Sequence, residues 1–156
     1  MIIEDTRQKA GKHDLKHQYF EEHNIEILRC KLPFGDYAPV PSITIDTKEN
    51  MDEIASNICG SEHKRFIAEC KSAKAAGCKL IILVENRIGI TDISEVHKWI
   101  NPRVIYSPKC VQGDRLQKAM ETISERYGVQ FMFCTPEAAG QTITEILRHE
   151  YDGCGN

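Results

Sequence analysis

The sequence lacks several features that would place it in a specialised class of protein. No apolar stretch approaches the roughly 18 residues that a membrane-spanning helix needs. The first residues do not combine a basic segment with an apolar run, so we expect no signal peptide. Its 7 cysteines are scattered and include no Cys-x-x-Cys pair, which argues against a zinc site or a disulfide framework. These absences favour an intracellular protein, cytoplasmic in a prokaryote or virus and nuclear in a eukaryote.

Internal repeats, low-complexity segments and linkers rich in proline, glycine and serine are also missing. A chain of 156 residues has the length of one domain and can bury its own core. We therefore expect a single domain over residues 1–151, followed by a flexible tail over residues 152–156.

An excess of positive charge is lacking as well, because the formal net charge is -3. Proteins that only bind DNA are usually basic, so this charge weakly disfavours a nucleic-acid partner. An enzyme that engages DNA through metal ions gathers carboxylates in its site, however, and these hide a local basic face in the total. One such face occurs near the N-terminus and is either a solvated helix surface or a DNA contact. Its members are Arg7, Lys9, Lys12, His13, Lys16 and His17.

What the sequence does contain is an alternation of strand and helix patterns. Strands are predicted over residues 1–4, 25–32, 42–48, 79–85 and 130–134, with a further short one at Asp36. Helices are predicted over residues 8–23, 50–59, 62–76, 91–100 and 114–127, with a last helix after Thr135. An early antiparallel meander followed by alternating strands and helices predicts a three-layer α/β fold with a mixed central sheet flanked by helices.

One short segment carries residues suited to phosphodiester hydrolysis. This reaction requires a hard cation held by oxygen ligands, a nucleophilic water and positive charge near the phosphate. Alternation along the strand places Asp46 and Lys48 on the same face, about 6–7 Å apart. Asp36 follows a turn and can lie beside Asp46, and the carbonyl of Thr47 is available as a further metal ligand. From spacing alone, a turn-forming aspartate and a solvated strand end remain the alternative.

Six motifs occur in one order along the chain. They are Ile3–Arg7 (against D-x-R-E), Leu32–Tyr37 (L-x-x-G-D-Y), Ile45–Asp52 (I-E-R-K-x-x-x-D), Ser61–Lys71, the apolar run Leu80–Glu85, and Tyr127–Glu137. Together they resemble, almost from end to end, the nuclease domain of the XPF and Hef type, a branch of the PD-(D/E)XK superfamily. The resemblance implies a restriction-endonuclease-like fold and a DNA endonuclease that depends on Mg²⁺ or Mn²⁺.

The resemblance also implies roles for the matched residues of the site. Asp36 and Asp46 stand at metal-ligand positions, and Asp5 stands at the edge of the site as a further ligand. Lys48 stands at the position of the catalytic lysine, which positions the attacking water or stabilises charge on the phosphate. Asp52 is expected to orient Lys48 or the arginine of the following helix.

Three basic residues are expected to contact DNA phosphates. They are Arg7 in the first motif, and Arg65 and Lys71 in the fourth. For Arg65, a salt bridge at helical spacing to Glu62 or Glu69 is the alternative.

The chain departs from the family pattern at three positions and in one module. Asp46 replaces a glutamate, Thr47 stands where the family has an arginine, and Gln8 stands where the first motif has its acid. The first change keeps a carboxylate, whereas the other two alter the charge around the site. The tandem helix-hairpin-helix module that supports dimerisation and branched-DNA recognition in XPF and Hef is not found in the sequence.

These observations leave more than one function open. The first is a metal-dependent endonuclease that cuts duplex or branched DNA, such as forks, flaps or junctions. The second, suggested by Gln8 and Thr47, is a catalytically inactive DNA-binding or scaffolding module of the same family. A junction resolvase of the same superfamily is a third. Apolar positions over residues 114–151 suggest a homodimer, and we expect neither a membrane partner nor an organic cofactor.

Overall fold

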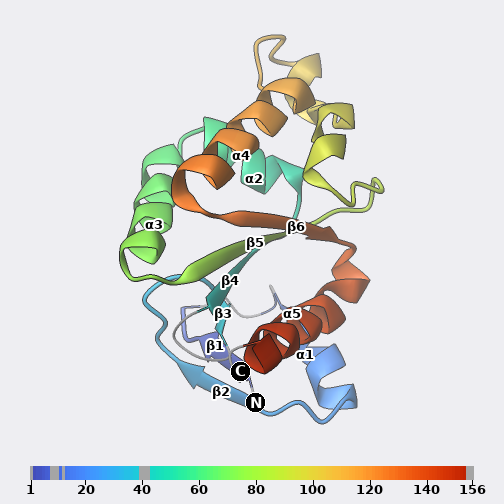
Figure 1. The fold of residues 1–156 in the computed structure, drawn as a ribbon. Helices are drawn as coiled ribbons and strands as arrows, with labels where there is room; N and C mark the ends of the chain where they lie inside the picture. The colour runs from blue at the N-terminus through green and yellow to red at the C-terminus, as the bar shows by residue number, and fades with distance from the viewer. Residues whose placement is uncertain (1, 8–10, 12, 39–42, 154–156) are drawn as a thin grey trace.

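The protein is built around one sheet. In this computed structural model, which describes residues 2–7, 11, 13–38 and 43–153, six strands follow the order β2-β1-β3-β4-β5-β6 (Figure 1). The strands are β1 (Ile2–Asp5), β2 (Ile27–Cys30), β3 (Tyr37–Ala38), β4 (Ile43–Lys48), β5 (Lys79–Glu85) and β6 (Gln130–Cys134). The helices are α1 (Asp14–Glu22), α2 (Met51–Cys59), α3 (His63–Ala75), α4 (Gly113–Tyr127) and α5 (Ala139–Gly153), with short 3-10 helices η1 (Ile93–Lys98), η2 (Pro102–Ile105) and η3 (Pro136–Ala138).

Helices cover both faces of the sheet, α2, α3 and α4 on one and α1 and α5 on the other (Figure 1). Alternate residues of β5 point into two separate hydrophobic cores. Leu80, Ile82 and Val84 pack against α2, α3 and α4. Ile81 and Leu83 pack against α1 and α5. The predicted three-layer α/β fold with a mixed sheet is confirmed. Within the described ranges, every helix falls short of the length and hydropathy that a bilayer crossing requires.

The first strands differ from the expected antiparallel meander. β1 pairs with β2 in parallel, and β3 pairs antiparallel with both β1 and β4. The meander prediction is wrong because β2 pairs with β1 rather than with β3. The helix α1 connects β1 to β2. A crossover helix returns the chain in its original direction, which makes the two strands parallel. β1 therefore lies inside the sheet, between β2 and β3.

β4 and β5 form the buried centre of the sheet. All residues of β4 are buried, as are those of β5 from Leu80 to Glu85. The two strands are parallel, and their register sets Asp46 beside Ile82 and Lys48 beside Val84. Parallel strands with helices on both faces have this continuous burial. Two charged side chains at the end of β4 consequently lie in a region nearly closed to solvent.

Local signals set the ends of several elements as predicted. β5 and β6 have the predicted bounds, and Asn50 caps α2 by accepting a hydrogen bond from the amide of Glu53 (2.9 Å). The helix expected over residues 91–100 is instead the shorter η1. The expected start of the first helix, residues 8–10 and 12, lies outside the described residues. α5 continues to Gly153, whereas residues 154–156 of the expected tail are not described.

The basic face near the N-terminus is not a solvated surface throughout. Lys16 of α1 is buried and forms an ion pair with Glu85 at the end of β5. The Nε2 atom of His17 lies 2.6 Å from Oε1 of the buried Glu4 in β1. Both contacts hold α1 against the sheet. The expectation of a solvated or DNA-facing surface fails for the buried Lys16 and His13, whereas His17 is exposed. Lys9 and Lys12 lie outside the described residues.

Removing one charge of the buried ion pair should destabilise the fold. We expect Lys16→Met to lower the free energy of unfolding by about 3–5 kcal/mol, because the buried Glu85 loses the ammonium group of this ion pair. The double variant Lys16→Met/Glu85→Leu should recover part of this loss. Urea denaturation measures both. Lys118→Met, at an exposed position of α4, is the control and should change stability by less than about 0.5 kcal/mol. An equally small effect of Lys16→Met would contradict the buried pair.

Candidate active site

Asp46 and Lys48 meet at the carboxyl end of β4. The Nζ atom of Lys48 lies 2.6 Å from Oδ2 of Asp46, and the two side chains are only 4% and 9% exposed. The Lys48 ammonium also lies 5.8 Å from the centre of the Phe66 ring in α3. Burial lowers the pKa of Lys48, but the adjacent Asp46 carboxylate outweighs it, so the pKa is raised overall. The lysine therefore carries its charge inside the fold.

Asp36 reaches the same end of β4 from the preceding turn. Its Oδ2 atom accepts hydrogen bonds from the amide (2.8 Å) and hydroxyl (2.7 Å) of Thr47. Its own amide donates to the carbonyl of Ile45 (2.6 Å), and its carbonyl accepts from the amide of Asp5 (2.8 Å). Asp36 is thereby held between β1 and β4. The structure brings together the two aspartates and the lysine that the sequence singled out.

A glycine immediately before Asp36 makes this turn possible. Gly35 has φ +72°, in the left-handed region, and a Cβ atom there would collide with the hydroxyl of Thr44. That hydroxyl is itself fixed by donating to the carbonyl of Phe34 (2.9 Å). The amide of Gly35 donates to Oε1 of Glu69 in α3 (3.0 Å). The turn is therefore held by Thr44 of β4 on one side and by Glu69 of α3 on the other.

Glu69 is a site residue that the sequence reasoning missed. From the sequence, Glu69 is expected only as a salt-bridge partner of Arg65. Burial, and then the negative charge of Asp46, raise the pKa of Glu69, so the two carboxylates lie in one electrostatic environment. A signal for this position existed: Glu69 lies beside Cys70 and one turn after Phe66, both of which are buried in α3. Its place on the helix is thus at the border of the face that meets the sheet.

The surroundings of Asp46 make its carboxyl harder to ionise than that of an exposed aspartate. Burial, followed by the negative charge of Asp36, raises the pKa of Asp46 to about 6, although Lys48 lowers it. Its Oδ2 atom is buried and accepts no hydrogen bond of good geometry from the described residues; its contact is the ion pair with Lys48. A second cation near this oxygen would relieve the repulsion between the two aspartates.

Asp5 is engaged by Arg7 rather than by the two site aspartates. The Nε atom of Arg7 donates to Oδ1 (3.0 Å) and Oδ2 (2.8 Å) of Asp5, and a terminal nitrogen of Arg7 also donates to Oδ2. Burial works to raise the pKa of Asp5, but the hydrogen bonds and charge of Arg7 lower it overall. Asp5 would have to exchange this partner to act as a ligand. The Arg7 side chain is 55% exposed.

The remaining predicted residues lie around the site with other partners. Arg65 pairs with Glu62 (3.1 Å), which is the helical alternative considered from the sequence, and its side chain is 63% exposed. Lys71 is exposed on α3. Asp52 was expected to orient Lys48 or Arg65, but these residues pair with Asp46 and Glu62. Asp52 instead lines a cavity along α2.

The donor set fits a hard divalent cation that keeps part of its water shell. Asp36 and Asp46 supply carboxylate oxygens, and Mg²⁺ is commonly bound by one or two carboxylates together with waters and substrate phosphates. Among the described residues, no three histidine, cysteine, aspartate or glutamate side chains come close enough to enclose a metal ion. A cation held here would therefore need oxygen atoms from water and substrate to complete its coordination.

The charge repulsion at Asp46 can be measured in the metal-free protein. We expect its carboxyl to titrate with a pKa of about 6, and Asp36→Asn to lower this pKa because a negative neighbour is removed. The folded protein then binds a proton more tightly than the unfolded chain between about pH 3.8 and 6, so this group makes the free energy of unfolding fall as pH rises through that window.

Side-chain carboxyl NMR of Asp46 across a pH series provides the measurement. Asp14→Asn, which removes an exposed carboxylate from α1, is the control and should leave the Asp46 pKa unchanged. A wild-type value at or below 3.8 would show that this carboxylate is not desolvated beside Asp36.

The Gly35 turn should tolerate no side chain. An alanine in the left-handed backbone region costs about 1–2 kcal/mol. We expect Gly35→Ala to lower the free energy of unfolding by more than this, because the new methyl group also collides with Thr44. Gly89→Ala is a matched control, since Gly89 has φ +81° and nothing within 4 Å of the added carbon. Urea denaturation of the two variants compares them directly, and equal losses would mean that the contact with Thr44 is relieved at no cost.

Comparison with known proteins agrees with this geometry. The sequence model of the ERCC4 domain matches residues 4–146. The structure is similar to that of XPF from Aeropyrum pernix in complex with DNA, with a TM-score of 0.69 and 18% identity over 97% of this chain and 65% of that one. It is similar to XPF from Aeropyrum pernix without DNA, with a TM-score of 0.68 and 18% identity over 96% and 66% of the two chains.

The chain spans slightly less than two thirds of the XPF chains that it matches. At this identity the likeness shows a shared fold, and no curated protein sequence is significantly similar to the chain. The restriction-endonuclease-like fold and the XPF-type resemblance expected from the sequence are thereby confirmed. Because the family match extends over most of its length, this protein belongs to the ERCC4 domain family.

Proposed function

We propose that the protein is a metal-dependent DNA endonuclease that hydrolyses phosphodiester bonds. The observation that carries this proposal is the convergence of Asp36, Asp46 and Lys48 at the buried end of β4, in a chain of the ERCC4 domain family. Two carboxylates can hold a divalent cation, and an ammonium group can stabilise negative charge on the phosphate, as metal-assisted hydrolysis uses them.

Asp36 and Asp46 would hold Mg²⁺ or Mn²⁺, with the carbonyl of Thr47, water and a phosphate oxygen completing the coordination. Such an ion supplies Lewis-acid polarisation of the phosphate and a more acidic bound water. The Thr47 amide and hydroxyl fix one oxygen of Asp36, so its carboxylate is oriented before substrate arrives. This orientation reduces the reorganisation that accompanies binding.

Lys48 would stabilise negative charge on the phosphate or position the attacking water. Its ammonium lies beside Asp46, and the Lys48 side chain is 4% exposed, so little water screens its charge. A positive charge held in such a poorly solvated place acts more strongly on a developing anion than one in bulk water. Glu69 would act as a positioning residue, because it binds the Gly35 amide in the turn that carries Asp36.

DNA contacts would extend around this centre through Arg7, Arg65 and Lys71. Arg7 and Arg65 have side chains that are 55% and 63% exposed, so each can exchange part of its present ion pair for a phosphate. Asp5 would contribute at the edge of the site once Arg7 turns toward the substrate. Asp52 is a less direct supporting residue, since it lines the cavity along α2.

The resemblance supports branched DNA, such as forks, flaps or junctions, as the substrate class, with plain duplex as the simpler case. A homodimer is also proposed. It is supported by β6, the last strand of the sheet, whose Phe131, Met132 and Phe133 are only half-buried. Action on DNA implies a place inside the cell.

Cleavage of defined DNA shapes tests the proposed function. We expect the wild type to cut labelled fork, flap, junction or duplex DNA with Mg²⁺ or Mn²⁺, and Asp36→Asn and Lys48→Met each to lower the rate by about 10²–10³-fold or more. Lys74→Met, which removes an exposed lysine of α3, is the matched control and should retain activity. Calorimetric titration of both metals measures cation binding separately.

Two outcomes would point elsewhere. A wild type that binds DNA but neither binds metal nor cuts would establish the catalytically inactive module, for which Thr47 in place of arginine is the motivating residue; Gln8 lies outside the described residues. Paired symmetric nicks confined to four-way junctions would indicate a resolvase.

A further inference from the structure

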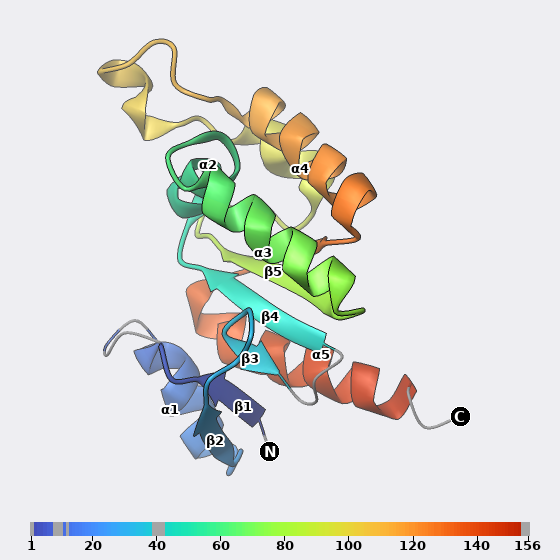
Figure 2. The same cartoon turned by 90° about the vertical axis from the view of Figure 1, so that its left-hand side faces the viewer.

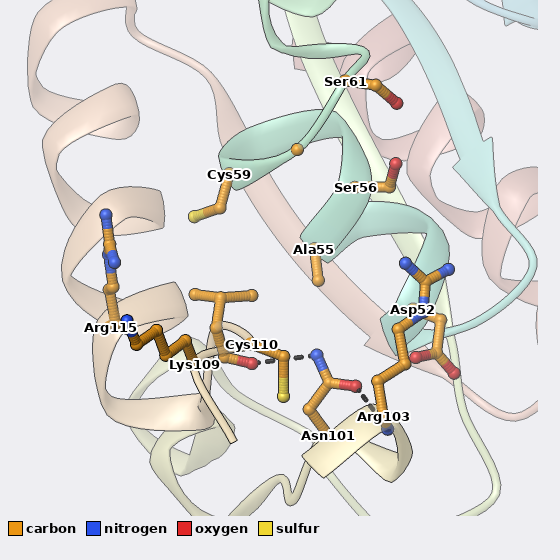
Figure 3. A pocket seen from close by; sticks show the side chains of 12 residues that line it. Asp52, Ala55, Ser56, Cys59, Ser61, Asn101, Arg103, Lys109, Cys110 and Arg115 are labelled. Carbon is orange, nitrogen blue, oxygen red and sulfur yellow. Dashed lines mark hydrogen bonds between the residues drawn. The ribbon is translucent and has the colours of Figure 1, made fainter. Parts of the chain in front are cut away.

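A cavity of about 440 Å³ lies along α2, and neither Asp46 nor Lys48 lines it. Its walls come from α2 and the turn that follows it, from the segment of residues 101–111, and from the start of α4 (Figure 3). Three cations line it, Arg103, Lys109 and Arg115, and all three are exposed. The hydroxyl groups of Ser56 and Ser61 add neutral donors to the same wall.

The charge of this cavity differs from that of the protein as a whole. Three cations line it with a single carboxylate, Asp52, although the chain carries a formal net charge of -3. Within the described ranges, neither Arg103, Lys109 nor Arg115 forms an ion pair, whereas Arg87 is paired. A cavity lined by three cations and one carboxylate has an excess of positive charge, which favours an anionic ligand.

The segment that bears two of the cations is held in shape by one buried residue. Asn101 is 4% exposed; its Oδ1 accepts from the amide of Arg103 (3.0 Å), and its Nδ2 donates to the carbonyl of Val111 (2.9 Å). The amide of Asn101 donates to Oε1 of Gln112 (3.0 Å). Asn101 thus ties the two ends of the segment together, which sets Arg103 and Lys109 on one rim.

We propose that this cavity, here called the basic cavity, binds the phosphate backbone of the DNA substrate on one side of the scissile bond. The proposal rests on the proposed nuclease function. α2 begins at Met51, shortly after Lys48, and both its first-turn Asp52 and its final Cys59 line the cavity. In Figure 2 the carboxyl end of β4, α2 and the segment around η2 lie on the same side of the molecule.

The length of α2, along which the basic cavity lies, suits a stretch of DNA backbone. A helix of 9 residues such as α2 is about 13 Å long. One strand of B-DNA rises 3.4 Å per nucleotide, so this length corresponds to about four nucleotides. The basic cavity is therefore within reach of backbone that continues from the phosphate at Lys48.

The surroundings of the basic cavity favour nucleic acid over a small anion. The same segment exposes Ile105 by 78% and Tyr106 by 89%. Basic grooves with aromatic side chains at their edge are typical of DNA-binding surfaces, because bases stack on the ring while cations hold the phosphates. A free phosphate ion would make no use of these apolar side chains.

Metal-free DNA binding tests the proposal. The variant Arg103→Ala/Lys109→Ala/Arg115→Ala is compared with Lys74→Ala/Arg126→Ala/Arg148→Ala, which removes three exposed cations outside the cavity. Fluorescence anisotropy of labelled fork DNA is measured in EDTA from 50 to 200 mM salt. We expect the first variant to bind at least tenfold more weakly at low salt. For this variant, the slope of log affinity against log salt concentration should be smaller in magnitude by up to about 2.7, which is about 0.9 for each of three lost phosphate contacts.

The outcomes separate this proposal from the proposed function. If both triple variants lose affinity equally, the effect is one of net charge and the basic cavity is not a DNA site. If inorganic phosphate binds the wild type at the cavity while the first variant binds DNA as the wild type does, the site serves free phosphate and the proposal fails. If the wild type cleaves DNA and the first variant retains full affinity, this proposal alone falls. A wild type that neither binds nor cleaves DNA would remove both.

Discussion

The site depends on a carboxylate and an ammonium group that lie side by side inside the centre of a sheet. Taking these two charges out of water is costly, and their mutual attraction offsets the cost only because they are 2.6 Å apart. β4 must therefore keep its register between β3 and β5, since a shift by one residue would turn both groups to the other face. The helices on both sides exclude the water that would otherwise weaken the pair.

The position of Asp36 shows how the chain accommodates its departures from the XPF pattern. Thr47 lacks the charge of the family's arginine, but its hydroxyl and amide both bind Asp36. Glu69 binds the amide of Gly35 from α3, so the turn is tied to a helix as well as to the sheet. The geometry of Asp36 consequently rests on hydrogen bonds from uncharged donors, while Lys48 supplies the positive charge at the site.

Local patterns in the sequence predicted the parts of the fold that depend on periodicity. The apolar run of β5, the alternation that joins Asp46 to Lys48 and the capping residue Asn50 are all properties of neighbouring residues, and the structure confirms them. The parallel pairing of β1 with β2 could not be predicted in this way, because it depends on how α1 crosses the sheet. Contacts between distant segments, such as Lys16 with Glu85 and Glu69 with Gly35, leave no local pattern either.

The chain has 1 tryptophan, and its place gives the region around η2 a built-in optical reporter. Trp99 is 5% exposed, and its carbonyl accepts a hydrogen bond from the amide of Gly113 (3.2 Å). The next residue, Ile100, is 73% exposed, so the indole lies at the junction between the core and the projecting segment. An indole in such an apolar setting emits at shorter wavelength than one in water. Displacement of the segment would therefore register in the intrinsic fluorescence without any label, and no second tryptophan obscures the signal.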